Sequence, residues 1–154
     1  MSAQGHRAEV PGIRLIDRIP GGREPDAHLT LCFEDRQKNR LRARLDDGRE
    51  VAVVLESQGV MRGGDHLGGD GLTVEVRAAE ENVSMVSSSD SHLLARACYH
   101  LGNRHVPLDI RPGEVAYQRD HVLDEMVRGL GLTVEHVART FEPEAGAYGA
   151  HEHR

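Results

Sequence analysis

The residues with the clearest chemical potential are the histidines, of which the 154-residue chain contains ten. His105 lies between a predicted helix end and a predicted strand start, in the segment Tyr-His-Leu-Gly-Asn-Arg-His-Val-Pro-Leu-Asp-Ile of residues 99–110. The backbone orients an imidazole at such a junction, and neutral imidazole is the commonest nitrogen ligand of borderline transition metals. One interpretation of His105 is therefore a metal ligand. The alternative is a histidine that only hydrogen-bonds a nearby carbonyl group.

A pair of histidines lies among the last residues of the sequence, in His151-Glu152-His153. Two imidazoles separated by one residue reach the same cation when the chain folds around it, and the carboxylate between them adds an oxygen donor. A tail loses conformational entropy when it closes over a metal, which suits a site that releases its ion. We therefore expect His151 and His153 to form a mobile gate, the alternative being a terminal pair without function.

One copy of His105 does not complete a metal shell. In a two-fold homodimer with this residue near the axis, the isologous interface supplies two such imidazoles, and tail histidines add further nitrogens. A shell of this kind suits Ni(II), Cu(II) or Zn(II), and ligand type does not choose among them. Because imidazoles bind metals only when neutral, affinity is expected to fall below about pH 6.5.

His121 is a further candidate ligand, at the start of a predicted helix, although its position alone favours a solvated surface histidine. The other histidines have no partner at ligand spacing or, for His100, lie on the edge of a helix. We interpret five of them as ordinary surface or strand residues: His6, His28, His66, His92 and His136.

The elements that position these histidines fall into two parts, and the first is rich in predicted strands. Alternation of apolar and polar residues predicts strands, and Asp46-Asp47-Gly48 is a hairpin signal. A glycine-rich stretch over 63–71 is predicted as a loop. These features indicate a small all-β domain of short antiparallel strands over residues 1–79. Its predicted strands are 28–33, 41–45, 51–55 and 72–76.

The second part alternates strands with two helices. Ser89 or Asp90 caps the first helix, Gly102-Asn103 ends it in the left-handed conformation, and Asp120 caps the second. The order β-α-β-β-α-β is that of a ferredoxin-like domain, predicted over residues 80–141, with a flexible tail over 142–154. The predicted fold class is therefore α+β. The predicted strands of this part are 82–86, 106–110, 114–117 and 132–137.

Composition excludes several functional classes. The formal net charge is −6 and no basic stripe offsets it, which argues against nucleic acid as a main partner. No stretch is apolar enough for a membrane span or a signal peptide, so we expect a cytoplasmic protein. Cys32 and Cys98 are expected to be free thiols. No nucleophile elbow, phosphate-binding loop or His-Glu-x-x-His motif occurs, so we expect no enzymatic activity.

With these residues in place, the chain resembles the UreE family of urease accessory proteins, which are nickel metallochaperones. The most specific segment is Arg-Ala-Cys-Tyr-His-Leu-Gly-Asn-Arg-His-Val-Pro-Leu over 96–108. Blocks similar to the family also occur, in the family's order, at 34–38, 45–51, 120–126, 131–134 and 141–148. The resemblance therefore covers most of the chain.

The resemblance implies a homodimer built through the C-terminal domain and an N-terminal domain that docks other proteins. It implies that His105 of both chains binds Ni(II), aided by His151 or His153, and that nickel passes to apo-urease through the urease accessory GTPase and its companion proteins. Two departures from the family matter. Arg119 stands where some members have a histidine two positions before His121, and the tail holds two histidines where some members have many.

These observations predict a non-enzymatic nickel carrier of low stoichiometry for urease maturation. The main alternative is a protein-interaction module of the urease assembly complex, in which bound metal only staples the dimer and no nickel is transferred. A metal hydrolase that uses a His105-bound water is the second alternative, but the sequence offers no general base beside that residue.

Overall fold

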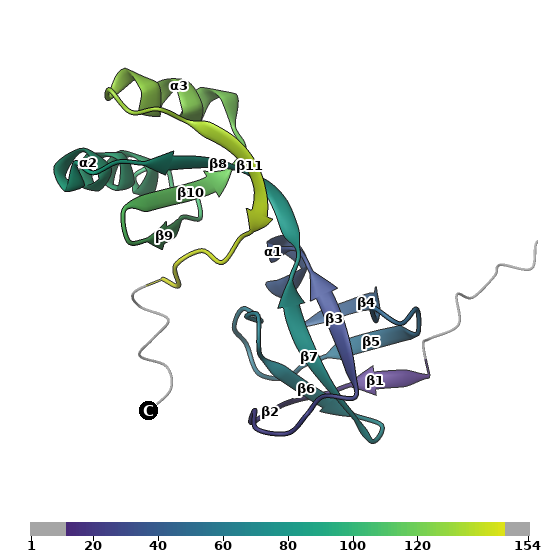
Figure 1. Ribbon diagram of the computed structural model, residues 1–154. Helices are drawn as coiled ribbons and strands as arrows, with labels where there is room; N and C mark the ends of the chain where they lie inside the picture. The colour runs from purple at the N-terminus through teal and green to yellow at the C-terminus, as the bar shows by residue number, and fades with distance from the viewer. Residues whose placement is uncertain (1–11, 147–154) are drawn as a thin grey trace, which may run out of the picture. The chain divides into compact units, whose positions relative to one another are not determined.

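The computed structural model describes residues 12–146. The chain divides between Arg77 and Ala78 into two compact units, each with its own sheets and its own core (Figure 1). No helix in the described residues is long and apolar enough to cross a membrane.

The N-terminal unit consists of two small sheets and one helical turn, α1 (Phe33–Arg36). One sheet has the order β1-β5-β4, and the other has the order β2-β6-β7-β3. The strands are β1 (Ile13–Leu15), β2 (Asp17–Ile19), β3 (Ala27–Leu31), β4 (Arg40–Arg44), β5 (Glu50–Val54), β6 (His66–Gly69) and β7 (Leu72–Ala78).

The all-β prediction for this unit is confirmed in its main lines, with three differences. The strand β1 pairs with β5 in parallel, so the sheets are not purely antiparallel. The strand predicted over 28–33 ends at Leu31, and the chain then turns into α1. The Arg36 side chain at the end of α1 is fully buried and donates hydrogen bonds to the carbonyl oxygens of Leu31 and Met61, each at 3.2 Å.

The third difference is the glycine-rich stretch, where a loop was the wrong prediction. Residues 66–69 form β6, which pairs with β7 through a two-residue turn at Asp70 and Gly71. Both turn residues have positive φ, 50° and 76°, as a type I′ hairpin turn requires. Gly69 is needed because a Cβ there would clash with the carbonyl oxygen of Arg14. The glycines therefore serve close packing as well as turning.

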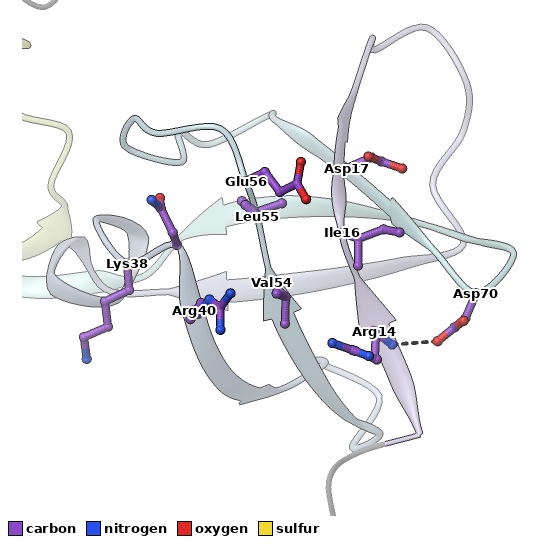
Figure 2. A pocket seen from close by; sticks show the side chains of 10 residues that line it. Arg14, Ile16, Asp17, Lys38, Arg40, Val54, Leu55, Glu56 and Asp70 are labelled. Atoms are coloured by element: carbon purple, nitrogen blue, oxygen red, sulfur yellow. Dashed lines mark hydrogen bonds between the residues drawn. The ribbon is translucent and has the colours of Figure 1, made fainter.

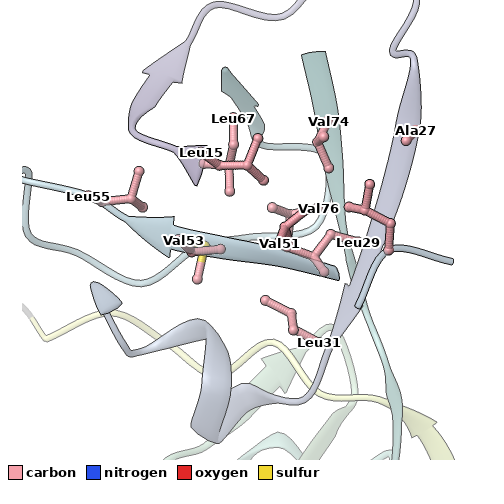
Figure 3. Close-up of a cluster of buried hydrophobic side chains, with 12 residues drawn as sticks. Leu15, Ala27, Leu29, Leu31, Val51, Val53, Leu55, Leu67, Val74 and Val76 are labelled. Carbon is pink, nitrogen blue, oxygen red and sulfur yellow. The ribbon is translucent and has the colours of Figure 1, made fainter. Parts of the chain in front are cut away.

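Aliphatic side chains from both sheets meet to form the core of this unit (Figure 3). Alternate residues of β5 show the pattern clearly, because Val51 and Val53 are fully buried on the inner face while Val54 is partly exposed. The fully buried members of this core are Leu15, Leu29, Val51, Val53, Met61, Leu67, Val74 and Val76.

The C-terminal unit is a four-stranded antiparallel sheet of order β11-β8-β10-β9, with two connecting helices. This order and the β-α-β-β-α-β succession confirm the ferredoxin-like prediction. The elements are β8 (Glu80–Ser87), α2 (Ser91–Gly102), β9 (Asp109–Arg111), β10 (Glu114–Gln118), α3 (His121–Gly129) and β11 (Glu135–Thr140).

Two strands of this unit begin three residues later than predicted. The apolar residues assigned to their starts lie in the connections instead, where Leu108 and Leu132 are 8% and 7% exposed and pack into the core. Periodicity alone does not distinguish a buried loop residue from a buried strand residue, which explains the error. The core itself combines both helices with the sheet, including Val86, Ala97, Leu101, Val115, Tyr117, Leu123 and Val127.

Candidate metal centre

The helix α2 holds the candidate ligand His105 close to its C-terminal end. Asp90 caps the helix, because its Oδ1 accepts hydrogen bonds from the backbone N–H groups of His92 (3.0 Å) and Leu93 (3.1 Å). The sequence left Ser89 or Asp90 as the cap, and the structure selects Asp90. Ala97 and Leu101 are fully buried and fix the rotation of the helix on the sheet.

His105 itself adopts the left-handed backbone conformation, with φ of 57°. The prediction that Gly102-Asn103 would supply this conformation is wrong, because Gly102 is still helical and Asn103 has φ of −63°. Instead, the turn ends at His105, after the predicted residues, where the His105 N–H donates a hydrogen bond to the Gly102 carbonyl oxygen (3.0 Å). Histidine is one of the few residue types enriched in this region. The histidine is thus both the candidate ligand and the turn residue.

Buried residues on either side fix the His105 turn. Leu101 precedes it with no exposure, and Leu108 follows it at 8% exposure. Between them His105 is exposed, and within residues 12–146 no hydrogen bond to its ring occurs. The alternative in which the ring bonds a nearby carbonyl therefore has no support in the described residues. Both ring nitrogens are available to a ligand from outside this segment.

The segment that leads to the chain end is attached beside this turn. The Glu144 N–H donates to the Leu108 carbonyl oxygen at 2.7 Å, and the Glu142 N–H donates to Asp109 Oδ2 at 3.1 Å. Asp109 is 3% exposed and also forms a paired contact with the Arg111 guanidinium (3.1 and 2.9 Å). The first residues of the predicted tail are therefore tied to the strand that follows His105.

The second candidate, His121, is the exposed first residue of α3. Because β10 runs antiparallel to β8, the start of α3 and the end of α2 lie at the same end of the sheet. His121 thus shares this end with the His105 turn. The ring of His100, on the last turn of α2, packs edge-on against Tyr99, with centroids 5.2 Å apart.

The described residues of one chain do not complete a metal site. Across residues 12–146, no group of three or more histidine, cysteine, aspartate or glutamate side chains is arranged to hold an ion. The predicted ligands His151 and His153 lie outside the described residues.

Two histidines taken as ordinary form specific contacts that the sequence did not predict. His66 is 7% exposed and lies 3.4 Å from Glu75, and His136 Nε2 lies 2.7 Å from Asp124 Oδ2. Asp124 is buried, and its Oδ1 accepts the Tyr117 hydroxyl at 2.8 Å. The β6–β7 hairpin sets His66 opposite Glu75, a pairing missed because residues 63–71 were predicted as a loop. The packing of α3 against β10 and β11 brings Asp124 to Tyr117 and His136, which spacing along the chain does not predict.

Together these observations define a two-domain protein whose ferredoxin-like unit presents an oriented histidine, without a partner among residues 12–146, beside the segment that begins at Glu142. Residues 13–79 match the N-terminal domain of the UreE urease accessory protein family, and residues 81–154 match its C-terminal domain.

Full-length relatives agree with this match. A urease accessory protein UreE from Alkalilimnicola ehrlichii is 56% identical over 138 residues, which cover 89% of this chain and 85% of that protein. A UreE from Pseudomonas putida strain F1 is 54% identical over 136 residues (87% and 81%). One from Enterobacter sp. strain 638 is 49% identical over 143 residues (92% and 94%). The chain belongs to the UreE family of urease accessory proteins, and this membership implies a role in urease maturation.

Proposed function

We propose that the chain is a nickel metallochaperone that binds Ni(II) at a homodimer interface and delivers it to apo-urease. The observation that carries the proposal is His105, an exposed imidazole without a partner in the described residues, held in a fixed turn between two buried leucines. Neutral imidazole suits Ni(II), and a side chain that the fold orients toward solvent is ready to bind a cargo ion.

Exposed apolar side chains support a dimer interface at the same end of the C-terminal unit. Tyr99, on the last turn of α2, is 66% exposed, and Val122, on the first turn of α3, is 60% exposed. Aromatic and apolar residues are enriched in the buried centres of interfaces. A two-fold axis near them brings two copies of His105 together, with His121 close by as an auxiliary ligand.

The attachment of Glu144 to Leu108 supports a role for the tail histidines. His151 lies seven positions after Glu144, and an extended chain of that length reaches at most about 25 Å. Leu108 lies three residues from His105, which is at most about 10 Å of chain. The chain is therefore long enough for His151 and His153 to reach the His105 turn. Their entry would close the nickel shell, and their exit would release the ion to the urease accessory GTPase and apo-urease.

Nickel titration of three forms tests this proposal: wild type, His105→Ala, and a chain truncated after Tyr148. Calorimetry should show about one tight ion per dimer in the wild type, as a site on a two-fold axis requires. Tight binding should disappear in His105→Ala and weaken about tenfold or more in the truncated chain, because an ordered shell loses donors.

One tight ion per monomer that is indifferent to His105 would contradict the axial site. Transfer is tested separately, by mixing the nickel-loaded dimer with the accessory GTPase and apo-urease and measuring urease activation. A loaded dimer that never passes on its ion would favour the metal-stapled interaction module instead.

A further inference from the structure

The strand register of the N-terminal unit places four arginines on one sheet surface. Residues 40, 42 and 44 alternate along β4, and β5 sets Val54, Ala52 and Glu50 directly opposite them. Arg14 on β1 is also opposite Ala52, on the far side of β5. We call the surface formed by Arg14, Arg40, Arg42 and Arg44 the arginine face. It corrects the expectation that the chain has no basic stripe.

The arginine face is the solvent side of this sheet. Val51 and Val53 point into the core with no exposure, so the alternate residues of β5 lie on the outer side. Arg14 and Arg42 flank Ala52 from two neighbouring strands, which sets their backbones about 10 Å apart. Ala52 is only 7% exposed although it is on the outer side, which fits coverage by the arginine stems on both sides.

Three of the four arginines on this face form no ion pair with the described residues. Arg44 pairs with Glu50 at 3.1 Å, but within residues 12–146 no ion pair occurs at the guanidinium groups of Arg14, Arg40 or Arg42. Uncompensated cations on neighbouring strands attract anions at a distance and pair with carboxylates on contact.

A hollow of about 1080 Å³ lies beside the arginine face and shares residues with it (Figure 2). Arg14, Arg40 and Val54 line one part of it, and the exposed Ile16 (47%) adds a second apolar side chain. Other residues that line it are Asp17, Lys38, Asn39, Leu55, Glu56 and Asp70. Asp70 accepts a hydrogen bond from the Arg14 backbone N–H at 2.7 Å, and Lys38 pairs with Asp35 at 2.8 Å. Among the cations that line the hollow, Arg14 and Arg40 have guanidinium groups without an ion pair in the described residues.

We propose that the arginine face docks an acidic segment of a partner protein, with carboxylates on Arg14, Arg40 and Arg42 and an apolar side chain over Val54 and Ile16. That the partner belongs to the urease assembly rests on the proposed function. The net charge of −6 and the carboxylates of Asp17 and Glu56 disfavour a long polyanion such as nucleic acid. A short acidic segment beside an apolar spot avoids that repulsion.

Fluorescence anisotropy with a labelled peptide of alternating Glu and Val, seven residues long, tests the proposal on the full chain. Wild type should bind this peptide in preference to its Lys-Val counterpart and to a 12-base-pair DNA duplex. The double variant Arg40→Gln/Arg42→Gln should bind about three- to thirtyfold more weakly, as expected for two exposed charge pairs. Raising the salt from 50 to 200 mM should weaken the wild type more than this variant.

Arg23→Gln/Arg96→Gln is the matched control, because both arginines are exposed, form no ion pair in the described residues, and change the net charge equally. It should bind the peptide like wild type. Equal losses in both double variants, absence of peptide binding, or preferred binding of the duplex would overturn the proposal. Nickel titration of Arg40→Gln/Arg42→Gln should match wild type, so failure of the docking face is distinguishable from failure of the nickel site.

Discussion

At the scale of single residues, the backbone of His105 is the most informative feature. A non-glycine residue in the left-handed region costs about 1–2 kcal/mol relative to the helical region. Such strain persists only where the surroundings impose it, and here Leu101 and Leu108 are buried on both sides of the turn. A glycine would fit this turn with less strain but would carry no imidazole. The left-handed conformation of His105 therefore lowers the stability of the fold at the position proposed to bind nickel.

Replacing His105 separates these two roles. His105→Gly should be more stable than His105→Ala by about 1 kcal/mol, because glycine adopts positive φ without a Cβ clash. Urea unfolding of both variants without metal checks this difference. Neither variant should bind nickel tightly. Equal stability of the two would mean that the turn changes conformation once the imidazole is removed.

At the scale of elements, a buried polar cluster joins β10, α3 and β11. Asp124 accepts hydrogen bonds from Tyr117 at 2.8 Å and lies 2.7 Å from His136. Burial alone would raise the pKa of the Asp124 carboxyl, but its polar interactions with Ser84, His136 and Tyr117 outweigh burial and lower that pKa. Burial and the hydrogen bond to Asp124 raise the pKa of the Tyr117 hydroxyl. Ionised Asp124 thus anchors α3 to the sheet.

A lowered carboxyl pKa stabilises the fold above the unfolded-state pKa, about 4, and that stabilisation is lost as the pH falls through the folded-state pKa. Asp124→Asn should therefore lower the free energy of unfolding by about 1–3 kcal/mol at pH 7. The gap to wild type should narrow below about pH 4. Urea unfolding across this pH range is the measurement.

The neighbouring Glu125→Gln is the control, because Glu125 is exposed and its ion pair within residues 12–146 is a surface contact with Arg128, at 2.8 Å. It should change stability by less than about 1 kcal/mol at any pH. If the difference in free energy of unfolding between wild type and Asp124→Asn stayed constant down to pH 3, Asp124 would not be the titrating group.

At the scale of the whole molecule, the two units divide the proposed tasks. Among the described residues, each unit has its own hydrophobic core. The candidate ligand and the attached root of the tail belong to the C-terminal unit, whereas the arginine face belongs to the N-terminal unit. Separate cores let each unit keep its fold when the other binds a partner.

The division predicts that residues 78–154 fold alone, because a chain of this size with its own core is large enough for independent stability. This fragment should dimerise and bind nickel with the stoichiometry of the full chain, and it should not bind the Glu-Val peptide. Calorimetry and sedimentation of the fragment check the first result, and anisotropy checks the second. A fragment that folds but no longer binds nickel would implicate the N-terminal unit in the site.

The sequence by itself determined the α+β class, the ferredoxin-like succession, the Asp120 N-cap and the family, because these depend on local periodicity and on residues adjacent in the chain. It also singled out His105. The tertiary structure decided what depends on distant residues. The parallel β1–β5 pair, the Asp124 cluster and the arginine face all arise when strands come into register.

The tertiary structure also decided that His105 is the residue in the left-handed conformation. Residue types permitted that conformation at Gly102, Asn103 or His105, and buried leucines on both sides accompany it at the histidine. The local residue types allow the left-handed conformation at several positions. The packing of the surrounding side chains decides which position adopts it, and sequence spacing does not show which side chains pack together.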